Sequence, residues 1–137
     1  MFKKVLFPVD RSREAREAAD VVIEVVKKYN SKLYLLSVLE PTPEEGKTVN
    51  PDAMTSPEAV AQLLETARSL FGEQGIPAEV MEREGNPAFT ICDVADEIDA
   101  DLIVMGCRGI GLTEEGVTDS VTTRVINLSP CPVLIVP

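Results

Sequence analysis

Five short segments with the pattern of strands, four of them largely apolar and one with apolar and charged residues in alternation, alternate along this chain with segments that have the spacing of amphipathic helices. This alternation favours an α/β fold, because parallel strands must be joined by crossovers long enough to hold a helix. The segment Leu102–Met105 is apolar throughout, as expected of a strand buried on both faces. The expected strands are Phe2–Val9, Lys32–Leu39, Ala78–Glu84, Leu102–Met105 and Val133–Val136.

Two of the expected helices begin with a capping residue followed by proline, in Ser56-Pro57 and in Asn86-Pro87. Proline at the first helical position costs no hydrogen bond and is typical of a helix start. Between the second strand and the second helix, Glu40–Thr55 is rich in Pro, Thr and Glu and has no apolar period, which predicts a mobile loop. The helices are expected over Arg13–Tyr29, from Ser56 to a stop at Gly72–Gly75, from Asn86 through Ile98, and over about Ser120–Leu128.

Length and charge limit the possible classes of protein. With 137 residues and 45% hydrophobic residues, the chain is expected to form one domain, residues 1–137, with a single core. A net charge of −10 argues against nucleic acids and anionic membrane surfaces as partners. No apolar run has the length of a membrane span, and no signal peptide is evident, so a cytoplasmic location is expected.

The residue types that are missing are equally informative. The sequence contains no histidine, which excludes Ser-His-Asp and Cys-His catalysis and any metal site with histidine ligands. No general base is evident, so no catalytic residue is expected and ATP hydrolysis, if present, should be slow. Three widely spaced cysteines, Cys92, Cys107 and Cys131, indicate reduced thiols in a reducing compartment.

The stretch Leu102–Ser120 predicts a binding site. An apolar strand runs into Gly106 and Gly109, and after a loop Ser120 opens a helical segment. A strand, a glycine turn and a helix start together form an anion site from backbone N–H groups, and a nucleotide phosphate is the leading candidate. If the first and fourth strands are neighbours where strand order reverses, Asp10 faces this turn.

The arrangement of these residues resembles the universal stress protein family. The family motif Gly-x2-Gly-x9-Gly-Ser/Thr corresponds to Gly106, Gly109 and the pair Asp119-Ser120. The opening Val5–Asp10 and the closing Ser129–Val136 also match the family pattern. The resemblance implies an α/β fold with a doubly wound, five-stranded parallel sheet of order 3-2-1-4-5 and helices on both faces.

The resemblance also implies an adenine nucleotide (ATP, AMP or cyclic AMP) as the ligand. Backbone amides of Gly109, Ser120 and Val121 are expected at the phosphates, supported by the hydroxyls of Ser120 and Thr122. Asp10 is expected near the ribose or near Mg²⁺ carried by the nucleotide, for which it is the candidate ligand. The full set of expected nucleotide-binding residues is Pro8, Val9, Asp10, Val38, Met105, Gly106, Arg108, Gly109, Asp119, Ser120, Val121 and Thr122.

Each of these residues also has a purely structural explanation. The glycines could serve only as turn residues, and Ser120 could serve only as a helix cap. Asp10 could be a solvated acid at a strand end, and Arg108 an ordinary loop arginine. Val9, Val38 and Met105, expected to enclose the base, could belong to the core.

One departure from the family motif affects the expected ligand. Asp119 stands where the family has glycine, and Glu114 and Glu115 precede it, so negative charge accumulates where the outer phosphates would lie. Each close pair of a carboxylate and an added phosphate charge should lower affinity about tenfold without metal. The sequence therefore predicts AMP or a cyclic nucleotide rather than ATP, and bound Mg²⁺ is the alternative that would turn repulsion into ligation.

The expected function is that of a nucleotide-binding regulatory protein in the stress response rather than a fast enzyme. The alternative is a member of the same family that binds no nucleotide and acts through protein–protein contacts. A nucleotidyl-transfer enzyme is the weakest possibility, because the chain lacks the histidine signature it needs. A homodimer is expected through Val133–Val136, whose apolar edge would otherwise remain unpaired.

Overall fold

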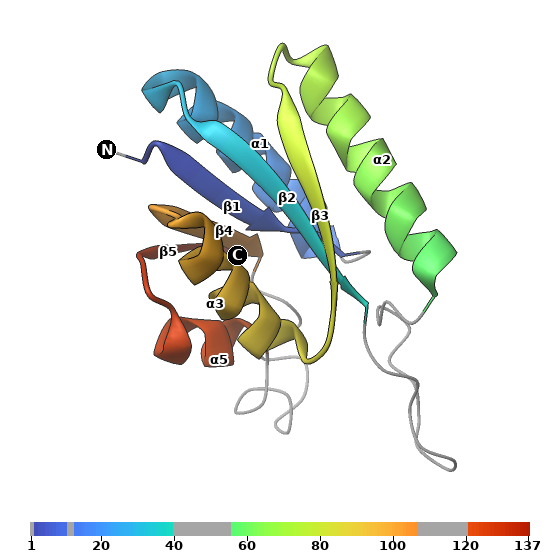
Figure 1. Ribbon diagram of the computed structural model, residues 1–137. Helices are drawn as coiled ribbons and strands as arrows, with labels where there is room; N and C mark the ends of the chain where they lie inside the picture. Colours follow the sequence, from blue (N-terminus) through green and yellow to red (C-terminus); the bar gives the residue numbers. More distant parts are fainter. Residues whose placement is uncertain (1, 11–12, 40–55, 107–120) are drawn as a thin grey trace.

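The computed structural model describes residues 2–10, 13–39, 56–106 and 121–137 (Figure 1). All five strands are parallel and lie in one sheet of order β3-β2-β1-β4-β5. The strands are β1 (Lys4–Pro8), β2 (Lys32–Leu39), β3 (Ala78–Glu84), β4 (Leu102–Gly106) and β5 (Val133–Val136). This confirms the predicted fold class and strand order.

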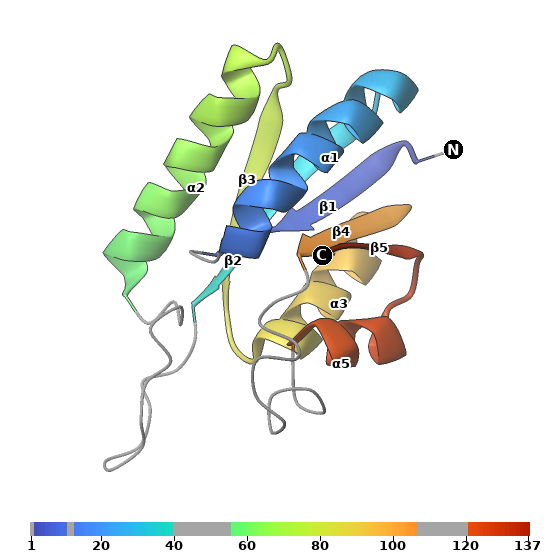
Figure 2. The ribbon, with the colours of Figure 1, turned by 180° about the vertical axis from the view of Figure 1, so that it is seen from behind.

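Helices cover both faces of the sheet. The helices are α1 (Arg13–Tyr29), α2 (Pro57–Glu73), α3 (Pro87–Ile98) and α5 (Val121–Leu128). Helices α3 and α5 lie on the face turned toward the viewer in Figure 1, and α1 and α2 lie on the opposite face, seen in Figure 2. No helix among the described residues is long and apolar enough to cross a bilayer.

The core has two layers, because alternate residues of each strand point to opposite faces. On β1, Val5 and Phe7 pack under α1 and α2, whereas Leu6 packs under α3 and α5. On β2, Leu35 and Leu36 divide in the same way. All five side chains are at most 1% exposed.

The helix starts predicted from capping residues are confirmed. The Ser56 hydroxyl accepts a hydrogen bond from the Ala59 N–H at 3.3 Å, and the Asn86 side chain accepts one from the Phe89 N–H, also at 3.3 Å. Each cap satisfies a backbone donor that the first helical turn leaves without a partner.

Three strand boundaries differ from the prediction. Strand β1 ends at Pro8 rather than Val9, and β4 ends at Gly106 rather than Met105. The first strand begins at Lys4 rather than Phe2, because Phe2 has a left-handed backbone with φ of 52°. Helix α2 ends at Glu73, within the predicted stop at Gly72–Gly75, and the left-handed turn comes at Gly75, with φ of 77°. The predicted loop Glu40–Thr55 lies outside the described residues.

Candidate functional site

The site is built where the order of strands reverses. From β1 the chain proceeds to β2 and β3 on one side, and then crosses to β4 and β5 on the other. Strands β1 and β4 are direct neighbours, with Val5 beside Leu102 and Leu6 beside Ile103. Ligands of open α/β sheets bind at the carboxyl ends of strands at such a reversal, so the predicted juxtaposition of the first and fourth strands is confirmed.

The end of β1 leaves peptide groups of β2 facing the site. Pro8 pairs with Leu36, and the Val9 N–H donates to the Leu36 carbonyl oxygen at 2.8 Å. In a parallel strand, residues two apart turn their N–H and C=O groups to the same side, so Val38 turns both groups toward the side of β1. Strand β1 ends at Pro8, whereas β2 continues to Leu39, so Val38 lies beyond the end of β1.

The register with β3 supports this orientation. The Gly85 N–H donates to the Leu39 carbonyl oxygen at 3.0 Å, so Leu39 faces β3 and its neighbour Val38 faces the other way. Val38 therefore presents one backbone donor and one backbone acceptor, side by side, at the carboxyl edge beyond Pro8. This pair is suited to a flat ligand that carries a matching acceptor and donor.

On the other side of the reversal, the start of α5 is fixed to the end of β4. The Thr122 hydroxyl donates to the Gly106 carbonyl oxygen at 3.1 Å, and Thr122 is 1% exposed. Its proton is thus used within the protein, where this bond holds the start of α5 against the end of β4. Val121, the first residue of α5, has one of the backbone N–H groups that a helix start leaves without an internal partner.

The three side chains expected to enclose a base do not lie in one layer. Val38 and Met105 pack together under α3 and α5, whereas Val9 packs under α1 and α2. All three are at least 92% buried, with exposures of 8%, 7% and 8%. A base that contacts all three must therefore lie at the end of the sheet, between the two core layers. Its plane would then extend the plane of the sheet beyond the end of β1.

The remaining expected site residues divide into two groups. Pro8 and Asp10 are half-buried at the end of β1, and Asp10 takes part in an interaction of its own. Among the described residues, no cluster of three or more acidic, cysteine or histidine side chains is suited to hold a metal ion. Four expected residues lie outside the described part of the chain, namely Arg108, Gly109, Asp119 and Ser120.

The two described cysteines have the properties of structural thiols. Burial raises the pKa of the Cys92 thiol, and nearby Asp93 and Cys131 add to the shift. Burial also raises the pKa of Cys131, although a hydrogen bond from Ser129 opposes the shift. A raised pKa keeps a thiol protonated and poorly nucleophilic.

Sequence reasoning missed three features of this region. It did not predict the bond from Thr122 to Gly106, the division of Val9 from Val38 and Met105, or the buried Ser37 hydroxyl, which has no hydrogen-bond partner among the described residues. The alternation of side chains along β2 was the available signal for this division. Pro8 pairs with Leu36, so Val9 shares the face of Ser37, and Val38 points to the opposite face.

Comparisons with known proteins agree with this architecture. The model of the universal stress protein family matches residues 1–137. The universal stress protein Sll1654 of Synechocystis sp. is 64% identical over 137 residues, which cover 100% of this chain and 87% of that protein. Universal stress protein MJ0531 of Methanocaldococcus jannaschii is 32% identical over 144 aligned positions, covering 99% and 82% of the two chains.

Solved structures of similar fold contain adenine nucleotides. A universal stress protein in complex with cAMP matches with a TM-score of 0.80 and 25% identity, covering 98% of this chain and 97% of the other. The universal stress protein of Archaeoglobus fulgidus in complex with dAMP matches with a TM-score of 0.74 and 25% identity over the whole of both chains. By its sequence and its fold, the chain belongs to the universal stress protein family.

Proposed function

We propose that this protein binds an adenine mononucleotide at the carboxyl edge of β1, β2 and β4 and acts as a regulatory protein. The observation that carries the proposal is the backbone N–H and C=O of Val38, which face the side of β1 beyond its end at Pro8. Adenine carries an amino donor beside a ring-nitrogen acceptor, which complements the C=O and N–H of one residue. The complexes of relatives with cAMP and dAMP support the same ligand class.

The phosphate is proposed to lie at the start of α5. Val121 is the first residue of α5, and the bond from Thr122 to Gly106 holds this helix start against the end of β4. A helix N-terminus and its open N–H groups favour an anion. In the sequence, Asp119 and Ser120 directly precede α5, so a carboxylate accompanies the phosphate site and favours ligands with few phosphate charges.

The test of adenine recognition uses the ligand, because a backbone edge cannot be changed by mutation. AMP and IMP differ at the six-position, where IMP replaces the amino donor by a carbonyl acceptor. Calorimetric titration should show AMP binding at least about tenfold more tightly than IMP, because IMP sets an acceptor against the Val38 carbonyl. Equal affinities, or no binding of AMP at millimolar concentration, would overturn the proposal.

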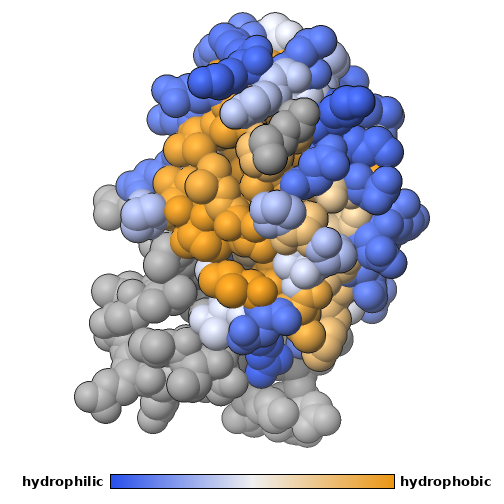
Figure 3. Space-filling view, turned by 90° about the vertical axis from the view of Figure 1, so that its left-hand side faces the viewer, coloured by the Kyte–Doolittle hydropathy of each residue, from blue (hydrophilic) through white to orange (hydrophobic). Residues whose placement is uncertain are grey.

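A second proposal concerns self-association through β5. This strand lies at the edge of the sheet and carries four uncharged apolar side chains, of which Leu134 is 37% exposed. Figure 3 shows apolar surface gathered on the side of the molecule that bears β5. Beside the strand, Phe2, Val25 and Tyr29 line a hollow of about 440 Å³ together with Leu134.

We propose that a second copy covers this edge by antiparallel pairing of β5, because an unpaired apolar edge promotes aggregation. Ile135→Lys should give a monomer or an aggregate in sedimentation experiments, because it places a charge on the edge strand where Ile135 packs against the core layer under α3 and α5. Val80→Lys on the opposite edge strand β3, where Val80 is 39% exposed among charged neighbours, is the matched control. A monomeric unaltered protein at micromolar concentration would contradict the dimer.

A further inference from the structure

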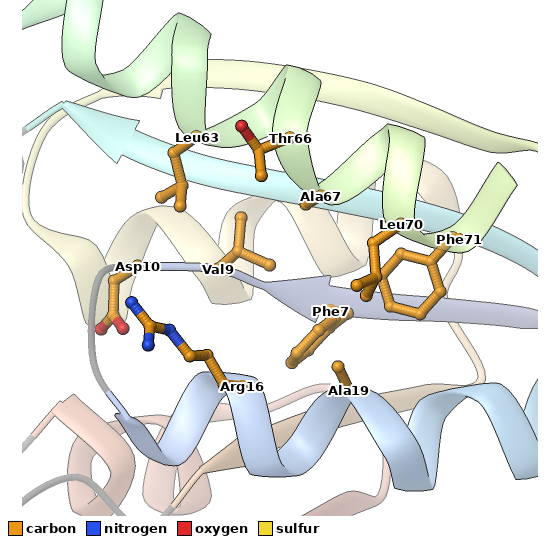
Figure 4. Close-up of a pocket in the computed structure, with 10 residues that line it drawn as sticks. All are labelled: Phe7, Val9, Asp10, Arg16, Ala19, Leu63, Thr66, Ala67, Leu70 and Phe71. Atoms are coloured by element: carbon orange, nitrogen blue, oxygen red, sulfur yellow. The ribbon is translucent and has the colours of Figure 1, made fainter. Parts of the chain in front are cut away.

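A second cavity lies on the face of the sheet opposite to Val38 and Met105. It has a volume of about 490 Å³ and opens between α1 and α2 above the end of β1 (Figure 4). Its lining residues are Phe7, Val9, Asp10, Arg16, Ala19, Leu63, Thr66, Ala67, Leu70 and Phe71.

The packing of the helices explains why the cavity exists. Helix α1 packs mainly on β1, β4 and β5, whereas α2 packs on β2 and β3, so β1 lies beneath the gap between the two helices. The walls at this gap include Ala19 of α1 and Ala67 of α2, whose small side chains do not fill it. Leu70 of α2 lines the same space and is 46% exposed.

The lining is apolar along most of its length and polar at one end. Phe7 and Phe71 form the apolar end, with their rings edge-to-face at a centroid distance of 6.0 Å. Asp10 and Arg16 lie at the other end, and Figure 4 shows the guanidinium of Arg16 extended toward Asp10 along the cavity. In the described part of the chain, Arg16 makes no hydrogen bond or ion pair, whereas Asp10 has an interaction of its own.

We propose that this cavity binds a medium-chain alkyl carboxylate, with the carboxylate beside Arg16 and the chain extended toward Phe71. An exposed guanidinium that pairs with none of the described residues favours an anionic head group, and its position in the first turns of α1 adds to the positive potential. The separation of Leu63 and Leu70 along α2 is about 10 Å, which suits a linear chain of medium length. Asp10 repels an anion at the same end and limits the gain from the head group.

The carboxylate site and the nucleotide site share residues. Val9 and Asp10 line the cavity and also belong to the expected nucleotide site, so the two ligands are expected to alter each other's affinity by the same factor. This coupling rests on the proposed nucleotide binding, whereas binding of the carboxylate does not. Titration of the carboxylate without nucleotide tests its binding alone. A second titration with saturating AMP tests the coupling between the two ligands.

The test compares decanoate with decanol by calorimetry, each below the concentration at which it self-associates. Decanoate is expected to bind at one site per chain, about three- to fivefold more tightly than decanol. Arg16→Gln should remove this preference and leave decanol binding unchanged. Arg68→Gln, on the exposed face of α2 where Arg68 pairs with Glu65 at 3.5 Å, should leave both affinities unchanged.

A second pair of variants tests the location. Ala67→Leu should fill the cavity and weaken decanoate binding at least about tenfold without lowering the melting temperature, because the added carbons enter open space. Ala61→Leu, an exposed position of the same helix, is the control and should bind decanoate normally. The proposal is overturned if decanoate does not bind, if Ala67→Leu binds it normally, or if Ala67→Leu instead changes the oligomeric state, which would identify a protein interface.

Discussion

The two ends of the sheet are built in different ways. At the amino end, backbone and side-chain hydrogen bonds tie successive elements together. The Lys4 N–H donates to a carboxylate oxygen of Asp101 at 3.0 Å, the Asp101 N–H returns a bond to the Lys4 carbonyl at 2.8 Å, and the Lys4 ammonium donates to the Ile98 carbonyl at 3.0 Å. The Lys32 N–H reaches the Lys3 carbonyl at 2.7 Å.

At the carboxyl end, one strand extends past its neighbour, because β2 continues to Leu39 where β1 ends at Pro8. Val38 presents its peptide edge beyond the last bond from Val9 to Leu36, and Thr122 holds Gly106 at the start of α5. The difference indicates that the bonds at the amino end mainly stabilise the fold, whereas the carboxyl end is where we propose that the ligand binds. Substitutions at the amino end should therefore change the free energy of unfolding, and substitutions at the carboxyl end should change nucleotide affinity.

The largest effect on stability is expected from Asp101→Ala at the amino end. Loss of the carboxylate leaves the Lys4 N–H without its acceptor and should lower the free energy of unfolding by about 1–3 kcal/mol. Urea denaturation measures this change, and AMP affinity should stay the same. Asp96→Ala, an exposed position on α3, is the control and should change stability by less than about 0.5 kcal/mol. A loss of AMP affinity in folded Asp101→Ala would break the proposed division between the two ends.

The next effect concerns ligand choice at the carboxyl end. Without magnesium, AMP or cyclic AMP should bind at least as tightly as ATP, and Asp119→Gly should raise ATP affinity about tenfold while changing AMP affinity less. Asp119→Asn removes the charge and keeps the side-chain size, so it should act in the same direction. Calorimetric titrations of both nucleotides decide the matter. Tighter binding of ATP than of AMP by the unaltered protein, with no effect of either substitution, would refute the charge argument.

The smallest change in stability and nucleotide affinity is expected from substitution of Thr122. Thr122→Val keeps the shape of the buried side chain but removes the donor to the Gly106 carbonyl, which should cost about 1 kcal/mol of stability. AMP affinity should also fall several-fold, because the start of α5 is no longer fixed to the end of β4. Thr122→Ser retains the hydroxyl and should restore AMP affinity. If Thr122→Val binds AMP normally, the bond has a structural role alone.

The sequence predicted the elements better than the details of the site, for physical reasons. Helix starts and strand positions depend on local features, such as Ser56-Pro57 and the apolar run in β4, and these were correct. The β1–β4 juxtaposition followed from the strand order that the family resemblance implies. The partner of the Thr122 hydroxyl and the cavity between Ala19 and Ala67 depend on how distant elements pack, which a local pattern does not encode.

The most direct test of the account is an NMR titration of the ¹⁵N-labelled protein with AMP. Amide signals of Val38, Gly106 and Val121 should shift as AMP binds, because these groups surround the carboxyl edge. Signals of Lys4, Lys32 and Asp101 at the amino end should stay in place. Shifts centred on the amino end, or unchanged signals of Val38 and Val121 at saturating AMP, would contradict adenine-nucleotide binding at the carboxyl end of the sheet.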